Sequence, residues 1–454
     1  MISSEDLVGL LGELLVNEPT TTDRAFSEIV VDSREASPGS LFVALRGEAL
    51  DGHQFVDDAL RRGAVGALVS EASGLRGSSM FVVEDPLFAL QEAGRRWRHR
   101  MRAQIVGITG SVGKTTVREA THQLLSARSQ THQSPRNYNG DIGLPIALLG
   151  IDPSDEWAVI EIGPYSQEEM ELLVSSARAD VGIVTNVGPT HLERFGTIAD
   201  TERIKGLLPA SLPSNGLAVL NGDDPRVRRM ATRTTADVFT FGLGPRCDLQ
   251  ASDVVARGFD GIGFDLRNTR TNEQVSVSSS LIGKHQAMTA LAASAVGLRA
   301  GLELSEIAEA LGSLRPGSRL TRRRAENGAT IIDDSYNAAP LSMKAALDLL
   351  ASCRPRRIAL LGDMFELGAE EQAAHREIGV YAADRCDWLI AVGERSRDVI
   401  ESAREAGHSE ACWVAESDQA LEIVRHSLEP RDTLLVKASH AMHLEAVVER
   451  LAAS

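Results

Sequence analysis

The chain has 454 residues, of which 43% are hydrophobic and 24% charged, and its formal net charge is -16 at pH 7. This length exceeds what one hydrophobic core supports and predicts about three domains. The acidic balance argues against a nucleic-acid surface, and the lack of any apolar stretch of membrane-spanning length argues against membrane insertion. Four widely spaced cysteines and a start without a basic signal region predict a cytoplasmic protein with reduced thiols.

Residues 1–100 are predicted to form an N-terminal domain. Apolar runs with polar flanks predict strands at 28–34, 41–45 and 65–69, and a helix at 56–62. Two polar loops, Asp32-Ser33-Arg34 and Asp51-Gly52-His53, connect these elements. The loops are either solvated turns of a small α/β domain or part of a ligand site, and composition alone leaves both interpretations open.

A second domain, residues 101–315, begins with a buried strand at 105–108 and a helix that starts near Thr116. The glycine-rich turn between them directs backbone N–H groups toward a phosphate at the helix N-terminus. Lys114 adds a charge for the outer phosphates, and Thr115 a hydroxyl for Mg²⁺. This order of strand, glycines, lysine and hydroxyls favours a nucleotide triphosphate over an ordinary strand–turn–helix corner. The predicted contacts are Gly110, Ser111, Val112, Gly113, Lys114, Thr115 and Thr116.

Buried strands at 157–162, 181–187 and 217–221 alternate with helices, which predicts a parallel, doubly wound sheet. Ligands bind beyond the carboxyl ends of strands in such sheets. Glu161 and His191 follow strand ends and are expected at the same edge as Lys114. A metal site at this edge is one interpretation. A solvated glutamate and a structural histidine are the other.

The third domain, residues 316–454, follows irregular antiparallel strands (245–283), two helices (285–299 and 304–311) and a linker at 315–319. The arginine run 322–324 is predicted to be a solvated part of the linker. A second nucleotide-type sheet is predicted, with strands at 330–333, 358–361, 388–392, 413–415 and 434–437 and a helix at 340–351. The polar residues expected at its edge are Asp334, Asp363, Glu394 and Lys437. Two sheets joined by a flexible linker predict closure over the nucleotide.

The chain also resembles the Mur ligases of peptidoglycan synthesis through motifs that occur in order along nearly its whole length. These are DSR with PGSLFVAL and DGH, TGSVGKTT, NYNGDIGLP, EIG, TNVGPTHLERFG, LNGDD, GKH, PGSR, DDSYNA, LLGDMFELG and LVKAS. The resemblance implies an α/β fold of three domains: an N-terminal domain for a uridine nucleotide, a central P-loop parallel sheet, and a C-terminal Rossmann-like domain.

DDSYNA and GDM-x-ELG resemble the branch of the family that uses ATP to join D-alanyl-D-alanine to UDP-N-acetylmuramoyl-tripeptide. The implied reaction passes through an acyl phosphate, and the chain is expected to act as a monomer. Two alternatives are a Mur-type ligase with a different amine and carboxylate, and a non-catalytic ATP-binding protein. The third residue of the tripeptide is not specified by the motifs.

The resemblance also implies roles for particular residues. Catalytic roles fall on Lys114, His191, Lys205 and Arg319, with Arg319 reaching the γ-phosphate on closure. One Mg²⁺ is expected on Thr115 and Glu161, and a second metal position on His191 and on Lys205 carbamylated by CO₂. Further nucleotide contacts are expected from His285, Gln286, Arg319, Asp334, Tyr336 and Asn337. Substrate contacts are expected from Ser33, Arg34, Asn137, Asn139 and Asp141.

Several positions depart from the family pattern. Gly206, Leu207 and Leu208 follow Lys205 where an acidic residue is usual, so a solvated helix lysine is the alternative to a carbamate. Gln286, Thr289 and His440 replace two asparagines and an arginine of the family. These departures concern nucleotide fit and leave Lys114, Glu161, His191 and Arg319 unchanged.

Overall fold

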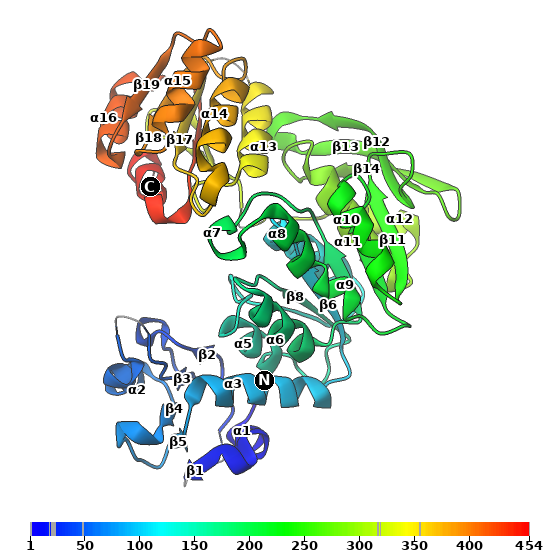
Figure 1. Ribbon diagram of the computed structural model, residues 1–454, viewed down its shortest axis with the longest axis vertical. Coiled ribbons are helices and arrows are strands. Elements are labelled where there is room, and N and C mark those ends of the chain that lie inside the picture. Colours follow the sequence, from blue (N-terminus) through cyan, green and yellow to red (C-terminus); the bar gives the residue numbers. More distant parts are fainter. Residues whose placement is uncertain are drawn as a thin grey trace. The chain divides into compact units, whose positions relative to one another are not determined.

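The computed structural model describes residues 2–17, 19, 24–47, 50–315, 317, 319–353 and 356–453. The chain divides into two compact units: unit 1 is Met1–Gly107 with Arg128–Val181, and unit 2 is Ile108–Ala127 with Gly182–Ser454. Three sheets, built largely of parallel strands, alternate with helices along the chain (Figure 1). The predicted α/β class is therefore confirmed, while the domain boundaries at 100 and 315 stay predictions.

The first sheet belongs to unit 1 and has the strand order β1-β5-β4-β3-β2. Its strands are parallel except for β1, which pairs with β5 in the antiparallel direction. β2 is shorter than predicted, because the Asp32 carboxylate accepts the N–H of Arg34 and begins a 3-10 turn at Ser33–Glu35. The elements are β1 (Leu15–Asn17), β2 (Ile29–Val30), β3 (Leu41–Val43), β4 (Gly66–Ser70), β5 (Met80–Val83), α1 (Ser4–Leu11), α2 (Val56–Arg62) and α3 (Pro86–Arg100).

The second sheet has the order β14-β13-β12-β11-β10-β9-β6-β8-β7. β7 and β8 belong to unit 1, β10 to β14 belong to unit 2, and β6 and β9 contribute residues to both units. The strands are β6 (Gln104–Thr109), β7 (Thr131–Gln133), β8 (Trp157–Glu161), β9 (Val181–Val184), β10 (Leu217–Asn221), β11 (Asp237–Gly242), β12 (Leu249–Ala256), β13 (Ile262–Asn268) and β14 (Glu273–Ser279).

Helices between these strands carry several of the predicted site residues. α5 (Gly143–Leu149) and α6 (Gln167–Ala177) belong to unit 1. Those of unit 2 are α4 (Lys114–Ser126), α7 (Leu192–Phe195), α8 (Ile198–Lys205), α9 (Leu207–Ala210), α10 (Pro225–Arg229), α11 (Gln286–Arg299) and α12 (Leu304–Gly312). Strand β9 ends three residues earlier than predicted, because the chain turns at Thr185 to contact the phosphate loop.

The third sheet, in unit 2, has the order β15-β16-β20-β17-β18-β19, with hydrophobic clusters on both faces. Its elements are β15 (Thr321–Arg324), β16 (Thr330–Asp333), β17 (Arg357–Gly362), β18 (Trp388–Val392), β19 (Ala411–Val414), β20 (Thr433–Lys437), α13 (Pro340–Ala351), α14 (Glu371–Ala382), α15 (Arg397–Glu405), α16 (Ser417–Ser427) and α17 (Glu445–Leu451).

The arginine run is solvated, as predicted, but it is not part of the linker, because it forms edge strand β15, antiparallel to β16. Its three arginines are exposed, and charged side chains are typical of edge strands because they oppose pairing with another sheet. Two residues of the predicted linker, Pro316 and Ser318, lie outside the described residues.

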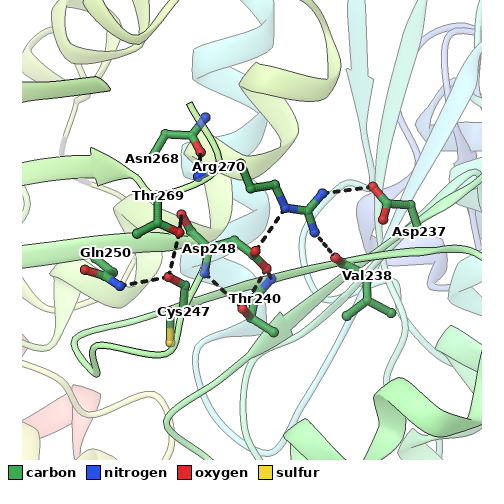
Figure 2. A network of polar contacts seen from close by, with 9 residues as sticks. All are labelled: Asp237, Val238, Thr240, Cys247, Asp248, Gln250, Asn268, Thr269 and Arg270. Carbon is green, nitrogen blue, oxygen red and sulfur yellow. Dashed lines mark hydrogen bonds and ion pairs between the residues drawn. The ribbon is translucent and has the colours of Figure 1, made fainter. Parts of the chain in front are cut away.

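Arg270 ties the antiparallel end of the second sheet together from the turn after β13 (Figure 2). Its guanidinium donates to Asp248 at 2.9 Å, to Asp237 at 3.2 Å and to the Val238 carbonyl. The same group lies 4.6 Å from the ring centre of Phe239. Each polar part of this side chain therefore has an acceptor or an aromatic face.

All four cysteines have free thiols. Burial raises the pKa of Cys247 to about 11 and that of Cys386 to about 12, and it also raises the pKa of Cys353 and Cys412. Among the described helices, none is both long and apolar enough to cross a membrane.

Candidate active site

The phosphate loop joins β6 to α4 through two glycines with positive φ angles. Gly110 has φ +148°, and a Cβ added there would lie 1.9 Å from the hydroxyl of Thr185, so a larger residue does not fit. Gly113 has φ +89° and caps α4, and a Cβ added there would meet no atom within 4 Å. Space is therefore open beside Gly113 at the N-terminus of α4, which is the end of a helix that attracts anions.

Loop 185–188, directly after β9, braces the phosphate loop from the side. The Asn186 amide accepts the N–H of Val112 at 2.9 Å and donates to the Val112 carbonyl at 2.9 Å. The Ser111 N–H donates to the Asn186 carbonyl at 3.0 Å. Two of the predicted phosphate-binding N–H groups thus bind Asn186 in this structure, and their role toward a nucleotide stays a prediction. Sequence reasoning did not single out Asn186, although it lies in the TNVG motif.

Two lysines donate to one carbonyl oxygen at the start of the phosphate loop. Lys114 Nζ donates to the Gly110 carbonyl at 2.9 Å, and Lys205 Nζ donates to the same oxygen at 3.2 Å. Lys205 is only 1% exposed, and its ammonium lies 5.8 Å from the ring centre of Phe195. Burial lowers the pKa of Lys205 far below its usual value, and the nearby Lys114 charge lowers it further. The alternative of a solvated helix lysine is therefore wrong.

His191 precedes α7 and contacts a loop of the third sheet. Its Nδ1 is paired with the Glu366 carboxylate, and the N–H of Leu192 donates to the Glu366 carbonyl at 2.8 Å. Both His191 (φ +56°) and Glu366 (φ +63°) have left-handed backbone, which is costly for residues with a side chain. The hydrogen bond from His191 lowers the pKa of Glu366. Sequence reasoning did not find this pair, whose members are separated by 175 residues.

The loop that carries Glu366 is held by buried polar contacts within the third sheet. Asp363 accepts the N–H and the hydroxyl of Ser396, His375 accepts the N–H of Met364, and the Ser439 hydroxyl accepts the N–H of Phe365. Asp363 therefore has a structural role at the predicted sheet edge, while Glu394 is exposed.

Glu161 ends β8 in unit 1 and is 3% exposed. Its carboxylate accepts a hydrogen bond from the Asn139 amide at 2.9 Å, and its N–H donates to the Ser134 hydroxyl. Glu161 and Asn139 lie in unit 1, whereas Lys114, Lys205 and His191 lie in unit 2. A metal site shared by Glu161 and the residues of unit 2 therefore stays a prediction.

Two of the predicted ribose and base contacts, Asp334 and Tyr336, line a cavity of about 210 Å³ together with Arg319. Arg319 lies 3.3 Å from the ring centre of Tyr336, and His440 stacks on the same ring at 5.0 Å between centres. Lys437 pairs with Asp334 at 2.7 Å and donates to the Asn337 carbonyl at 2.7 Å. Arg319, Asp334, Tyr336 and Asn337 thus lie in one part of unit 2, and their contacts with a nucleotide stay predictions.

Two further predicted nucleotide contacts lie at the start of α11. His285 is exposed to solvent. Gln286 is 8% exposed, and its side-chain carbonyl oxygen has no hydrogen-bond partner among the residues that the structure describes. Their contact with a nucleotide stays a prediction.

The polar loops of the first sheet have mainly internal partners. Ser33 donates to Asp58 at 3.0 Å, and Arg34 forms a bidentate pair with Asp32 while its side chain remains 82% exposed. His53 is bound on one side by Asp51 and on the other accepts the Ser70 N–H, which makes this motif structural. Asn137 and Asp141 lie in the loop of Asn139, and the substrate roles of all five predicted residues stay predictions.

No cluster of three or more His, Cys, Asp or Glu side chains is found among the residues that the structure describes. Mg²⁺ commonly takes only one or two protein ligands and completes its shell with water and substrate phosphates. Glu161 in unit 1 and Thr115 in unit 2 each carry an oxygen of the kind that Mg²⁺ takes, and their sharing of one ion stays a prediction.

Three family models match the chain: the Mur ligase middle domain at residues 108–297, the Mur ligase glutamate ligase domain at 318–440, and the catalytic domain of the Mur ligase family at 25–99. The chain is 35% identical to the UDP-N-acetylmuramoyl-tripeptide–D-alanyl-D-alanine ligase of Escherichia coli, with 97% of each chain covered. It is 31% identical to the ligase of the same name from Bacillus subtilis, with 93% of this chain and 92% of the relative covered.

Solved structures agree with these relatives. MurF from Acinetobacter baumannii superposes with a TM-score of 0.85 at 26% identity, covering 99% of this chain and 98% of the other. The MurF ligase from Thermotoga maritima in complex with ADP gives 0.80 at 26% identity, covering 94% and 98%. From its phosphate loop, its three sheets and these matches over almost its full length, the chain belongs to the Mur ligase family.

Proposed function

We propose that this protein is a cytoplasmic, ATP-dependent ligase that joins D-alanyl-D-alanine to UDP-N-acetylmuramoyl-tripeptide. The observation that carries the proposal is the meeting of Lys114 and Lys205 on the Gly110 carbonyl beside the open N-terminus of α4. The Lys114 charge and the N–H groups of α4 suit a triphosphate, and the buried Lys205 amine beside them suits modification by CO₂. The names of the relatives supply the substrates.

The reaction has two steps. The tripeptide carboxylate attacks the γ-phosphorus of ATP, which forms an acyl phosphate and breaks the bond to ADP. The amine of D-alanyl-D-alanine then attacks the acyl carbon, inorganic phosphate leaves with its electron pair, and the amine loses a proton. Both steps place negative charge on phosphoryl oxygens, so positioned cations lower their barriers.

The residues of this chain divide that work. Lys114 and the N–H groups of α4 would hold the β- and γ-phosphates. Arg319 would leave the Tyr336 ring and reach the γ-phosphate when the third sheet closes, so that chemistry waits for closure. Asp334, Asn337, His285 and Gln286 would contact the nucleoside. Mg²⁺, on Thr115 and Glu161, with a second position at His191, would supply charge neutralisation of the phosphates.

Lys205 is proposed to carry a carbamate. Its lowered pKa favours the neutral amine, which is the form that reacts with CO₂ to give R–NH–COO⁻ and a proton. Carbamylation would replace this buried amine, adjacent to Lys114, by an anion that pairs with Lys114 and suits a metal cation. The residues that follow, Gly206 to Leu208, place no carboxylate in the positions where family members have one.

The test is ADP and phosphate release by the purified full chain with each substrate omitted in turn. The proposal predicts that release requires ATP, UDP-N-acetylmuramoyl-tripeptide and D-alanyl-D-alanine together, and that the amide product is detected by mass. Release driven better by another amine or carboxylate would identify a different Mur-type ligase. ADP formation that does not depend on the dipeptide would contradict ligation.

A further inference from the structure

Two loops of unit 1 meet beyond the carboxyl end of β8, and a single carboxylate joins them. Glu169, in the first turn of α6, accepts the N–H of Asp141 at 3.0 Å through Oε1. Its second oxygen, Oε2, accepts the N–H of Tyr165 at 2.6 Å. One side chain thus fixes residue 141, which follows Asn139 closely in sequence, and residue 165, which follows Glu161.

The usual role of a residue at this position is different. Ser166 caps α6 and accepts the N–H of Glu169 at 3.1 Å, so the sequence Ser-x-x-Glu predicts a capping box. In a capping box the glutamate would return to the N–H of Ser166. Here both of its oxygens bind loop N–H groups outside the helix. The carboxylate therefore orders the two loops and does not complete the cap.

The loops that Glu169 joins also hold the buried metal-site candidate. The Asn139 amide donates to Glu161 at 2.9 Å, and the Asn139 carbonyl accepts the N–H of Gly163 at 2.9 Å. A Cβ added at Gly163 would lie 2.9 Å from the Asn139 side chain, so the contact has no slack. Any shift of residue 141 relative to residue 165 would move Asn139 against Glu161.

We propose that Glu169 is a positioning residue for Glu161, and that it acts through Asn139 by locking the two loops together. The inference rests on the proposed function only in that Glu161 works in the ligase reaction. It also assigns Asn139 a positioning role in addition to the substrate contact expected from sequence. Two acceptor oxygens are required, because both partners are N–H donors. A glutamine side chain is nearly the same size as glutamate, but it offers one acceptor oxygen and, in place of the second, an NH₂ group that cannot accept the N–H.

Hydrogen exchange on the substrate-free full chain tests the lock itself. In Glu169→Gln the amides of Asp141 and Tyr165 are expected to exchange about tenfold faster, since each tenfold equals roughly 1.4 kcal/mol of lost hydrogen bonding. The control is Glu171→Gln, on the same helix, because the exposed Glu171 carboxylate accepts only from the Gln167 side chain among its described hydrogen bonds. Unchanged protection at residues 141 and 165 would overturn the proposal, whatever the activity of the enzyme.

A double-mutant cycle tests the route through Asn139. Glu169→Gln and Asn139→Ala are each expected to lower kcat about tenfold, with the KM for ATP within a factor of two and the melting temperature little changed. The double variant is expected to lose no more than the stronger single variant, because both changes release the same group. Losses that multiply would contradict the positioning role, as would wild-type kcat in Glu169→Gln. An inactive wild-type chain would contradict the proposed function. The exchange experiment would then still test whether Glu169 holds the two loops together.

Discussion

The turn at Arg270 and the loop at Gly110 differ in the groups with which they surround a basic side chain. Two carboxylates and a carbonyl accept hydrogen bonds from the Arg270 guanidinium (Figure 2). The same guanidinium also lies over the ring of Phe239. Lys205 is fully buried beside a second lysine, and its pKa is driven down by that environment. A cation with acceptors on every side stabilises the fold, whereas an amine buried beside a second lysine is driven toward its neutral form, which is the form that a carbamate needs. The comparison separates structural charge from functional charge.

The largest effect is expected at Lys114. Lys114→Met removes the charge proposed for the β- and γ-phosphates, and kcat/KM should fall about 10³-fold. The matched control is Lys344→Met, whose ammonium pairs with Glu377 at 2.5 Å on the third sheet and should leave kcat/KM unchanged. Equal losses of kcat/KM in the two variants would show that Lys114 has no role that an ion-paired surface lysine lacks.

Lys205 should give the next largest effect. Lys205→Ala is expected to lower kcat about 10²-fold, and short carboxylic acids such as acetate should restore part of it by taking the place of the carbamate. Full activity without the side chain would contradict the carbamate, as would a loss that added carboxylates leave unchanged. Mass spectrometry after trapping of the carbamate gives a readout independent of turnover.

Glu366 should give a smaller effect on activity. Glu366→Ala leaves His191 without its carboxylate partner, and kcat should fall about tenfold. Glu366→Gln keeps an acceptor for the imidazole and should recover most of that loss. Exposed Glu370, in the same segment, provides the control Glu370→Ala. Identical rates for the alanine and glutamine variants would exclude an orienting role for this carboxylate.

Arg270 should affect stability and leave activity unchanged. Arg270→Ala is expected to lower the free energy of unfolding by about 1 to 2 kcal/mol, measured by urea titration. Arg267→Ala is the control, because its described hydrogen bond reaches only the exposed Asn272 side chain. A fall in kcat/KM with an unchanged free energy of unfolding would show that Arg270 serves activity and not stability.

The same variant has a predictable pH dependence. Burial raises the pKa of Asp248, but hydrogen bonds from Arg270 and Thr240 outweigh it, and the pKa lies below its usual value. A carboxyl with a lowered folded pKa contributes stability above about pH 4, where the unfolded carboxyl is ionised, and loses it as the pH falls through the folded pKa. Arg270→Ala should therefore show a shallower loss of stability below pH 4 than the wild-type chain.

Much of the fold could be predicted from local pattern. The bounds of α2, β10, β16, α13 and β18 agree with the apolar runs that predicted them, because these elements are buried and end at polar or turn residues. The arginine run of β15 was missed because an exposed edge strand has no apolar alternation to reveal it.

The site could be predicted only where its signal is local. The residues from Gly110 to Thr116 form one turn, so their spacing reports the geometry directly. The partners Asn186, Glu169 and Glu366 act across loops far apart in sequence, and polar loop residues show no periodicity. Burial of Lys205 also depends on tertiary packing, because its helix neighbours include both polar and apolar residues.

The thiols described above have a practical consequence for observing closure. With burial raising all four pKa values, little thiolate exists at neutral pH, and thiolate is the form that reacts with maleimides. Cysteines introduced at exposed positions of α15 and α6 would therefore take up fluorophores selectively in an otherwise native background. Energy transfer between such dyes during turnover would follow the movement of the third sheet in real time.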